Sequence, residues 1–312
     1  MGPDSEPRTS LRELQPGDTP EGASWYTFAP LGERPCARVG HNCFYLPPVD
    51  SSSSKGKVVI VGGANPNGSF SDVYFIDLES GTWESPEVTG TPPSPRTFHT
   101  SSAAIGDRLY VFGGGDKGAD PVQDQQLYIF DSATLTWQQP EVHGSPPAPR
   151  HGHAVVAVGS KLFIHGGLAG DTFYSDLYCI DTSDMKWELL LATGSVPGGR
   201  AAHSAAVFQS YLYIFGGMDP TGALDSMYKY HTEKGHWIQL EFKTPLPPGR
   251  LDHSMCIIPW EASSKNRDCE RAAGEETNGQ KESCLEEHLC LIFGGMDMRG
   301  ELYKDCLVSV LQ

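Results

Sequence analysis

Two side chains with chemical capacity recur together along this chain, an arginine and a histidine three residues after it. Imidazole can exchange protons near neutral pH or bind a metal, and a guanidinium can bind carboxylates through a planar fork of donors. Because a catalytic site needs such a pair once and this pair occurs five times, we interpret both residues as structural parts that satisfy buried loop carbonyls and carboxylates. They are Arg38, Arg96, Arg150, Arg200 and Arg250, with His41, His99, His153, His203 and His253.

No other arrangement of reactive side chains predicts catalysis. The eight cysteines include no C-x-x-C pair and no zinc-ligand spacing. The sequence also holds no phosphate-binding loop and no nucleophile elbow. Tyr178 and Cys179, a pair of the kind that copper oxidases use, fall within a regular strand pattern, and we interpret the isolated His165 as a packing residue. We therefore expect no catalytic residue, no metal, no cofactor and no enzymatic activity.

The arginine and histidine belong to a repeat of about 50 residues. Each histidine is followed by an apolar stretch that ends in two glycines, and in the first four copies a stretch that ends in tryptophan comes next. Glycines permit backbone conformations closed to other residues, and tryptophans pack between units, so we interpret both as structural. The glycines are Gly62, Gly63, Gly113, Gly114, Gly166, Gly167, Gly216, Gly217, Gly294 and Gly295, and the tryptophans are Trp83, Trp137, Trp187 and Trp237.

Each copy of the repeat predicts a four-stranded antiparallel sheet. Its short stretches are rich in valine, isoleucine, tyrosine and phenylalanine and are bounded by glycine, proline, aspartate and serine. The fifth copy ends at Gln312 before reaching a tryptophan, but Trp25 precedes Arg38 by the 13 residues that separate every other such pair. The predicted fold is therefore an all-β propeller of five four-stranded blades, whose last blade is closed by the N-terminal strand around Trp25.

The period, and the order of double glycine, spaced tyrosine and tryptophan, resemble kelch repeats over residues 25–312. Four stretches are more narrowly similar to kelch-repeat effectors of Rab-family small GTPases, namely 62–73, 94–106, 161–171 and 247–260. This resemblance implies binding to a late-endosomal Rab GTPase in its GTP form. It further implies promotion of vesicle transport from endosomes to the trans-Golgi network, including receptor recycling. Other trafficking proteins are further expected partners.

One feature departs from that narrower resemblance, which implies six repeats where this chain has five. A repeat omitted near Leu78 and Glu79 would explain the difference, because the two halves of the first copy join there with normal spacing. We interpret the chain as a splice form whose Rab binding depends on whether the omitted blade belongs to the contact surface.

Charge and hydropathy narrow the possible partners. The net charge of −16 and the pI near 5.0 oppose binding to nucleic acid or to anionic lipid. No apolar run approaches a bilayer span, and the first residues lack the layout of a signal peptide. We expect a cytoplasmic protein that associates with endosome membranes only through a partner. A second function remains open from the residues, a substrate-recruiting adaptor of a ubiquitin ligase assembled in trans.

A protein partner is expected on the loops that follow the double glycines, because these loops differ between copies while the scaffold repeats. The alternative is that several of these side chains fold back onto their own blades. The residues proposed as anchors are Phe70, Asp116, Phe173, Tyr174, Met218, Leu224, Met296, Met298 and Arg299.

The domain boundaries generate a first prediction. We expect residues 1–24 to be a disordered N-terminal segment, 25–312 to be a single propeller, and 261–288, which holds eight acidic and four basic residues, to be a disordered insertion in the last blade. Limited proteolysis followed by mass spectrometry of the fragments is therefore expected to cut first within 261–288. Early cuts spread over several blades would contradict this.

Overall fold

The computed structural model describes residues 13, 29–46, 48, 56–97, 102–116, 120–260 and 287–311. These residues form strands, turns and loops, and there is no helix among them. The chain divides into two compact units, which are described separately. The first comprises Met1–Val142 with Ala148–His151, and the second comprises His143–Pro147 with Gly152–Gln312.

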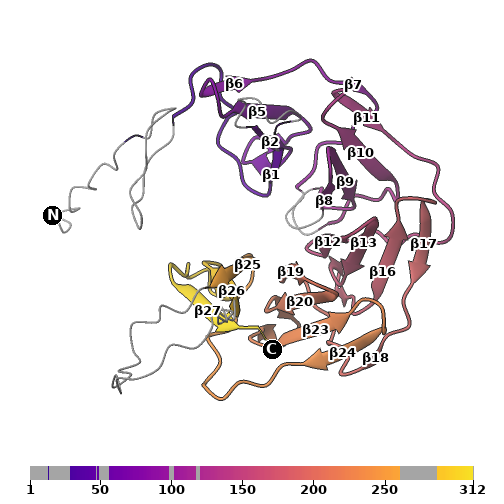
Figure 1. Ribbon diagram of the computed structural model, residues 1–312, viewed down its shortest axis with the longest axis vertical. Helices are drawn as coiled ribbons and strands as arrows, with labels where there is room; N and C mark the ends of the chain where they lie inside the picture. Colours follow the sequence, from indigo (N-terminus) through magenta and orange to yellow (C-terminus); the bar gives the residue numbers. More distant parts are fainter. Residues whose placement is uncertain are drawn as a thin grey trace, which may run out of the picture. The chain divides into compact units, whose positions relative to one another are not determined.

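The first unit holds two blades in which sequence neighbours pair antiparallel (Figure 1). Blade one has the order β1 (Asn42–Leu46), β2 (Lys57–Val61), β5 (Val73–Asp77) and β6 (Thr82–Glu84). Blade two has the order β8 (Ser102–Ile105), β9 (Arg108–Phe112), β10 (Leu127–Asp131) and β11 (Thr136–Gln138). A hairpin of β3 (Ala64–Asn65) and β4 (Gly68–Ser69) follows the first double glycine, and β7 (Thr89–Gly90) pairs with β11.

The second unit holds three blades built on the same plan. Blade three consists of β12 (Ala154–Val158), β13 (Lys161–His165), β16 (Leu177–Asp181) and β17 (Lys186–Leu189). Blade four consists of β19 (Ser204–Phe208), β20 (Tyr211–Phe215), β23 (Met227–His231) and β24 (His236–Gln239), with β18 (Thr193–Gly194) beside β24. Their hairpins are β14 (Leu168–Ala169) with β15 (Thr172–Phe173) and β21 (Met218–Asp219) with β22 (Gly222–Ala223).

Blade five has three strands among the described residues, β25 (Ser254–Trp260), β26 (Glu287–Phe293) and β27 (Cys306–Val310). The predicted all-β propeller with five blades is thereby confirmed. Pairing of Pro259 with His288 and of Trp260 with Glu287 extends the first hairpin of this blade. Residues 287–288, predicted to end the inserted loop, therefore belong to β26, and 261–286 lie outside the described residues.

The double glycines are required where backbone segments approach each other. Gly216 and Gly217 both have positive φ, at 65° and 88°. A Cβ atom at Gly216 would lie 2.7 Å from the carbonyl oxygen of Arg250, and one at Gly217 would lie 2.6 Å from that of Ala201. Any other residue would therefore push away the segment that leads into blade five, at Gly216, or the one that leads into blade four itself, at Gly217.

The tryptophans of the fourth strands lie in the cores. Trp137, Trp187 and Trp237 are buried. The ring of Trp137 joins a cluster with residues of β9 and β10, and that of Trp237 joins a cluster with residues of β13, β16 and β23. The ring of Trp137 lies 5.1 Å from Phe130, and that of Trp237 lies 5.0 Å from Tyr230. These contacts bury large apolar surfaces, which is the dominant favourable contribution to folding.

After Trp83, Trp137 and Trp187, a strap, defined here as the extended chain that leaves the fourth strand, pairs with the fourth strand of the next blade. The residue six positions after one tryptophan pairs in parallel with the residue just before the next, as Thr89 does with Thr136 and Thr193 with His236. Leu31 pairs with Thr82 in the same parallel arrangement, and Leu31 lies six positions after Trp25. Residues 29–32 thus pair with blade one in the same register as the straps that follow the other tryptophans.

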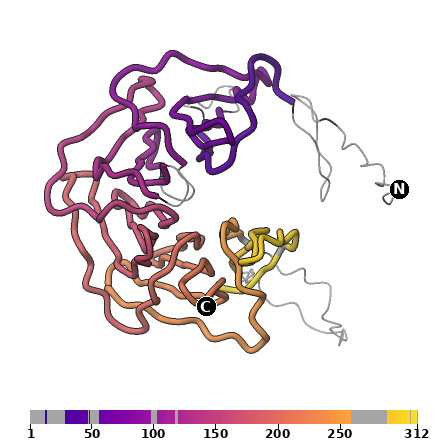
Figure 2. The backbone as a smooth tube through the Cα atoms, turned by 180° about the vertical axis from the view of Figure 1, so that it is seen from behind, coloured from indigo at the N-terminus to yellow at the C-terminus, as the bar shows by residue number. Residues whose placement is uncertain are grey.

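Beside β27, the second unit has an apolar groove of about 280 Å³, lined in part by Phe215, Met227, Phe242, Ile292 and Leu307. Blade four and blade five share a core here, and both lie side by side in Figure 2. One blade earlier, the residue that precedes the double glycine is His165, whose ring lies 5.3 Å from Trp237. Phe215 holds the same position in blade four that His165 holds in blade three. Since His165 contacts the fourth-strand tryptophan of the following blade, the groove beside Phe215 lies where the fourth-strand tryptophan of blade five is expected. Trp25 itself lies outside the described residues, and its strand stays a prediction.

This register generates the second prediction. Replacing Trp25 with alanine is expected to lower the free energy of unfolding by about 3–5 kcal/mol, because a buried tryptophan would be lost. Trp187→Ala, at a tryptophan that is buried in blade three, provides the matched reference. The measurement is urea unfolding followed by circular dichroism. A change below about 1 kcal/mol for Trp25→Ala, beside a large one for Trp187→Ala, would exclude a buried Trp25.

Candidate partner-binding face

The repeated arginines join three chain segments at the base of the loops that follow the double glycines. Arg96 is fully buried, and its Nη1 donates to the carbonyl oxygen of Gly113 at 3.0 Å, while its Nη2 donates to Asp124 Oδ2 at 2.7 Å. Its Nε donates to the carbonyl oxygen of Ser94 at 3.1 Å. Each of these hydrogen bonds gives a partner to a polar group that burial would otherwise leave unsatisfied.

The same arrangement recurs in blades one and five. Arg250 donates to the carbonyl oxygen of Gly294 at 2.9 Å and to both oxygens of Asp305, at 2.7 and 3.0 Å. Arg38 donates to the carbonyl oxygen of Gly62 at 2.9 Å and forms a forked ion pair with Asp72. Hydrogen bonds lower the pKa of Asp305 below its ordinary value, mainly through Arg250. These contacts are the ones expected of arginines that hold loops in place.

The buried histidines form contacts with neighbouring loops and strands. His203 and His253 are buried in the second unit. The Nε2 of His203 lies 3.0 Å from Nδ1 of His165, and the Nε2 of His253 lies 2.6 Å from Oγ of Ser204. His41, in contrast, is exposed, and His99 lies outside the described residues. His165 is thus a buried partner of a repeat histidine, in agreement with its interpretation as a packing residue.

Burial holds His203 and His253 in their neutral form. It lowers the pKa of His203 well below the ordinary value, with further lowering by His165 and Arg200. Burial also lowers the pKa of His253 to about 4, helped by the positive charge of Arg250. A buried neutral imidazole cannot take up a proton until the pH falls far below the pKa that it has in water.

Six of the nine proposed anchors are half-buried rather than freely exposed. The ring of Phe70 lies 4.4 Å from the guanidinium of Arg38, and Tyr303, its counterpart in blade five, lies 4.4 Å from that of Arg250. The carbonyl oxygen of Leu224 accepts from the amide of Arg250 at 3.0 Å. The six half-buried residues are Phe70, Phe173, Tyr174, Met218, Leu224 and Met296, and the ring of Phe70 packs on its own blade.

Three proposed anchors are exposed, Asp116 in the first unit and Met298 and Arg299 in the second. Met298 exposes 56% of its surface, and its side chain lies beside the blade-four hairpin at Gly222. The amide of Arg299 donates to Asp297 Oδ1 at 2.8 Å, which fixes the turn that presents both residues. Among the proposed anchors of the second unit, the exposed ones therefore lie on the loop of blade five.

Sequence reasoning missed the carboxylates that pair with the arginines. Asp72 and Asp305 each directly precede the third strand of their blade. The signal was present in the sequence as an aspartate recurring before the stretch that ends in tryptophan. It was overlooked because an isolated aspartate at a strand boundary is also an ordinary turn residue.

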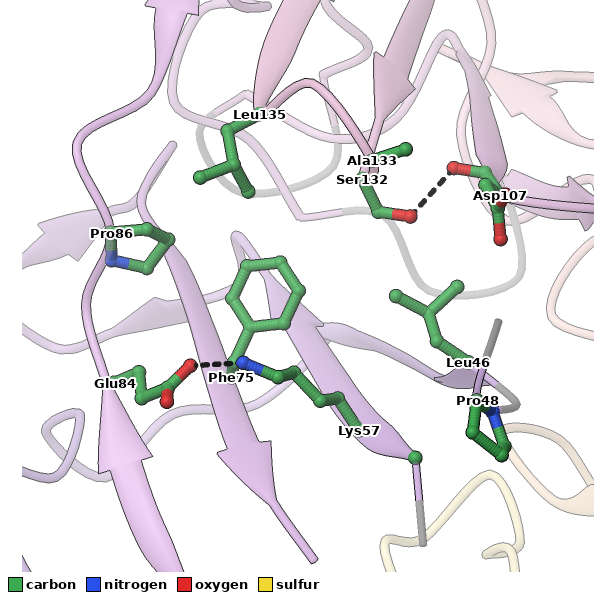
Figure 3. Close-up of a pocket in the computed structure, with 11 residues that line it drawn as sticks. Leu46, Pro48, Lys57, Phe75, Glu84, Pro86, Asp107, Ser132, Ala133 and Leu135 are labelled. Atoms are coloured by element: carbon green, nitrogen blue, oxygen red, sulfur yellow. Dashed lines mark hydrogen bonds and ion pairs between the residues drawn. The ribbon is translucent and has the colours of Figure 1, made fainter. Parts of the chain in front are cut away.

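A cavity of about 330 Å³ lies between the sheets of blades one and two in the first unit (Figure 3). Phe75 points into it, and the polar groups at its wall are satisfied by each other: Lys57 Nζ donates to Glu84 Oε2 at 2.6 Å, and Ser132 Oγ donates to the carbonyl oxygen of Asp107 at 2.8 Å. The residues that line it include no histidine and no cysteine. Within the described ranges, no group of three metal-ligating side chains occurs.

The fold, the double glycines and the repeated arginine pairs define a kelch-repeat β-propeller. A model of the KLHDC2/KLHL20/DRC7 Kelch-repeats domain matches residues 17–217, and a Kelch motif model matches residues 199–241. The chain belongs to the kelch-repeat family. Among solved structures, one titled "Structure of YjhT" superposes with a TM-score of 0.62 at 18% identity, covering 88% of this chain and 84% of the other, and shows the fold alone.

Several relatives of this chain share one name. This chain is 60% identical to the Rab9 effector protein with kelch motifs of Bos taurus and 55% identical to that of Homo sapiens, in both cases over 96% of this chain and 99% of the relative. The protein of that name from Danio rerio is 49% identical, over 96% of this chain and 98% of the relative.

The lengths of these alignments support the prediction of an omitted repeat. The alignment with the Bos taurus protein spans 369 positions, whereas 96% of the 312 residues of this chain is about 300. About 70 aligned positions therefore have no residue of this chain, which is at least the length of one repeat.

The buried histidines generate the third prediction. In the unfolded chain a histidine titrates near its ordinary value of about 6.5, while folded His253 stays neutral down to about 4. As the pH falls between these values the unfolded state binds the extra proton, so stability is complete above about 6.5 and is lost toward pH 4, by up to about 3 kcal/mol for this residue. Urea unfolding curves between pH 7.5 and 4.5 measure the loss.

His253→Asn supplies the control, because asparagine can hydrogen-bond to Ser204 but does not titrate. The variant is expected to start less stable at pH 7.5 and to lose less stability on acidification. Equal losses in the variant and in the unchanged protein would show that His253 does not contribute.

Proposed function

We propose that this protein is a nonenzymatic effector that binds a Rab-family GTPase in its GTP form. The observation that carries the proposal is the identity of 49–60% to proteins named Rab9 effector protein with kelch motifs, over almost the whole of both chains. The recurring arginines and histidines of the described blades serve the scaffold, which leaves surface recognition as the activity that the site supports.

The contact surface is proposed on the loops that follow the double glycines. The straps, the buried arginines and the tryptophan cores hold the strands in a fixed arrangement, so loops between them are presented with little loss of conformational freedom on binding. In the second unit this surface includes Met298 as an apolar anchor and Arg299 as a charged group at the tip of the blade-five loop. Such an anchor with a polar rim is typical of protein interfaces.

Through this partner the protein would promote vesicle transport from endosomes to the trans-Golgi network, and thereby receptor recycling. The described residues include no helix long and apolar enough to span a bilayer. Association with endosome membranes is accordingly proposed to come from the membrane-bound GTPase, with the protein otherwise in the cytoplasm.

The fourth prediction tests this function directly. Full-length protein is passed over immobilised Rab9 loaded with a nonhydrolysable GTP analogue or with GDP, and retention is measured. At least tenfold stronger retention on the GTP form is expected, because an effector distinguishes the two nucleotide states by differential affinity. Equal retention on both forms, or none on either, would contradict the proposed function.

Two variants locate the contact. Met298→Ala with Arg299→Ala is expected to weaken retention, since it removes the exposed anchor and its neighbouring charge. Leu191→Ser, at an exposed residue that follows β17, is the control and is expected to retain the affinity of the unchanged protein. If the control weakens binding while the loop variant does not, the contact lies elsewhere.

A further inference from the structure

Arg200, the arginine at the entrance to blade four, has no carboxylate partner. Its Nε donates to the carbonyl oxygen of Gly198 at 3.2 Å, and its Nη1 donates to that of Gly216 at 3.1 Å and to Oγ of Ser226 at 3.3 Å. Asp72, Asp124 and Asp305 form ion pairs with the corresponding arginines of blades one, two and five. A serine hydroxyl therefore stands where these three blades have an acid.

The difference comes from an inverted pair of residues before the third strand. Blade one has Ser71-Asp72 at this point, whereas blade four has Asp225-Ser226. The amide of Gly216 donates to the carbonyl oxygen of Ser226 at 3.1 Å, just as that of Gly62 donates to Asp72. Ser226 is therefore the structural equivalent of Asp72. Asp225 precedes it in extended chain, where successive side chains point to opposite sides, and it is exposed.

The guanidinium of Arg200 is buried with less compensation than its counterparts. Only 3% of the residue is exposed, and this burial lowers its pKa. The ring of Tyr228 lies 5.0 Å away and offsets part of the charge. Asp219, on the hairpin, attracts Arg200 electrostatically without forming an ion pair with it, and its carboxylate accepts from the amide and the hydroxyl of Thr221, at 2.8 and 2.6 Å. A buried cation without a paired anion is costly, so an additional negative group would stabilise this site.

The position of the missing carboxylate is open to solvent. The side chains of Asp72, Asp124 and Asp305 are 36%, 30% and 41% exposed, although they reach buried arginines. A carboxylate from outside can therefore approach Arg200 along the path that these side chains follow from within. The place lies at the foot of the β21–β22 hairpin, and the other end of that hairpin faces Met298 at Gly222.

We propose that the Arg200 guanidinium binds an acidic side chain, aspartate or glutamate, of a protein partner, in the place that a carboxylate of the chain itself occupies in blades one, two and five. The carboxylate would accept from the Arg200 guanidinium as Asp305 accepts from Arg250, and Met298 would supply the neighbouring apolar contact. The identity of the partner rests on the proposed function, whereas the affinity of the site for a carboxylate does not.

Acetate, the simplest carboxylate, tests the site in the protein alone. Thermal unfolding is measured in chloride and in acetate at equal ionic strength and pH 7.5. Acetate is expected to raise the midpoint of the unchanged protein more than that of Ser226→Asp, whose own carboxylate fills the site. In chloride, Ser226→Asp is expected to unfold on the order of 2–4 °C higher than the unchanged protein.

Two further variants complete this arm. Ser226→Ala retains the site and is expected to keep the acetate response, while Asp305→Ser creates a second site at Arg250 and is expected to enlarge it. Equal acetate responses in the unchanged protein and Ser226→Asp, or no stabilisation by Ser226→Asp in chloride, would overturn the proposal.

The second arm uses GTP-loaded Rab9 as the protein partner. Ser226→Asp is expected to weaken its binding at least tenfold, because the new carboxylate blocks and repels the incoming one, while Ser226→Ala keeps it. Unchanged binding by Ser226→Asp would show that the site takes small anions only and would overturn the assignment to a partner side chain. Absence of Rab9 binding by the unchanged protein would count against the proposed function, while the acetate response would still decide whether the site exists.

Discussion

The buried guanidinium at the entrance of each described blade is the interaction on which the arrangement of the loops depends. In blade two, Arg96 connects the segment before the first strand, the carbonyl of a double glycine and the aspartate before the third strand. These segments are up to 28 residues apart in sequence, and the arginine adds side-chain bonds to the backbone bridge between Thr97 and Gly115. Because the charge is buried, removing any one partner would leave polar groups unsatisfied, so the three segments keep a single arrangement.

Much of the fold could be predicted from the sequence because its physical requirements repeat. The double glycines mark places where a Cβ atom would strike a neighbouring carbonyl, and the tryptophans mark the cores, so a fixed spacing between them indicates one kind of blade. The fourth strand of the last blade is predicted less directly, because the fifth copy of the repeat ends before it reaches a tryptophan. The prediction that the residues around Trp25 supply this strand rests on spacing alone, because Trp25 is separated from β27 by nearly the whole chain.

The candidate site was harder to predict than the fold. Large apolar residues in variable loops suggested anchors, yet Phe70 covers Arg38 and Leu224 supports the loop of Arg250. The same residue types serve both purposes, because an aromatic ring that stabilises a buried arginine looks in sequence like one that contacts a partner. The inversion at Asp225-Ser226 was equally hidden, since composition is unchanged and only the register relative to Gly216 distinguishes the two orders.

The straps that follow the tryptophans have a consequence for how chains of this kind change length. Each junction uses the same positions on both sides, six residues after one tryptophan and one residue before the next. Any blade can therefore follow any other without a new joint having to be built. A deletion of one whole period leaves each strap paired with an equivalent fourth strand of another blade. A deletion of half a period would leave one strap without a fourth strand in the matching register. Evolution and splicing can thus shorten or lengthen such a protein in whole blades, and the 21 residues that separate Gly62 from Trp83 across the inferred point of omission match that rule.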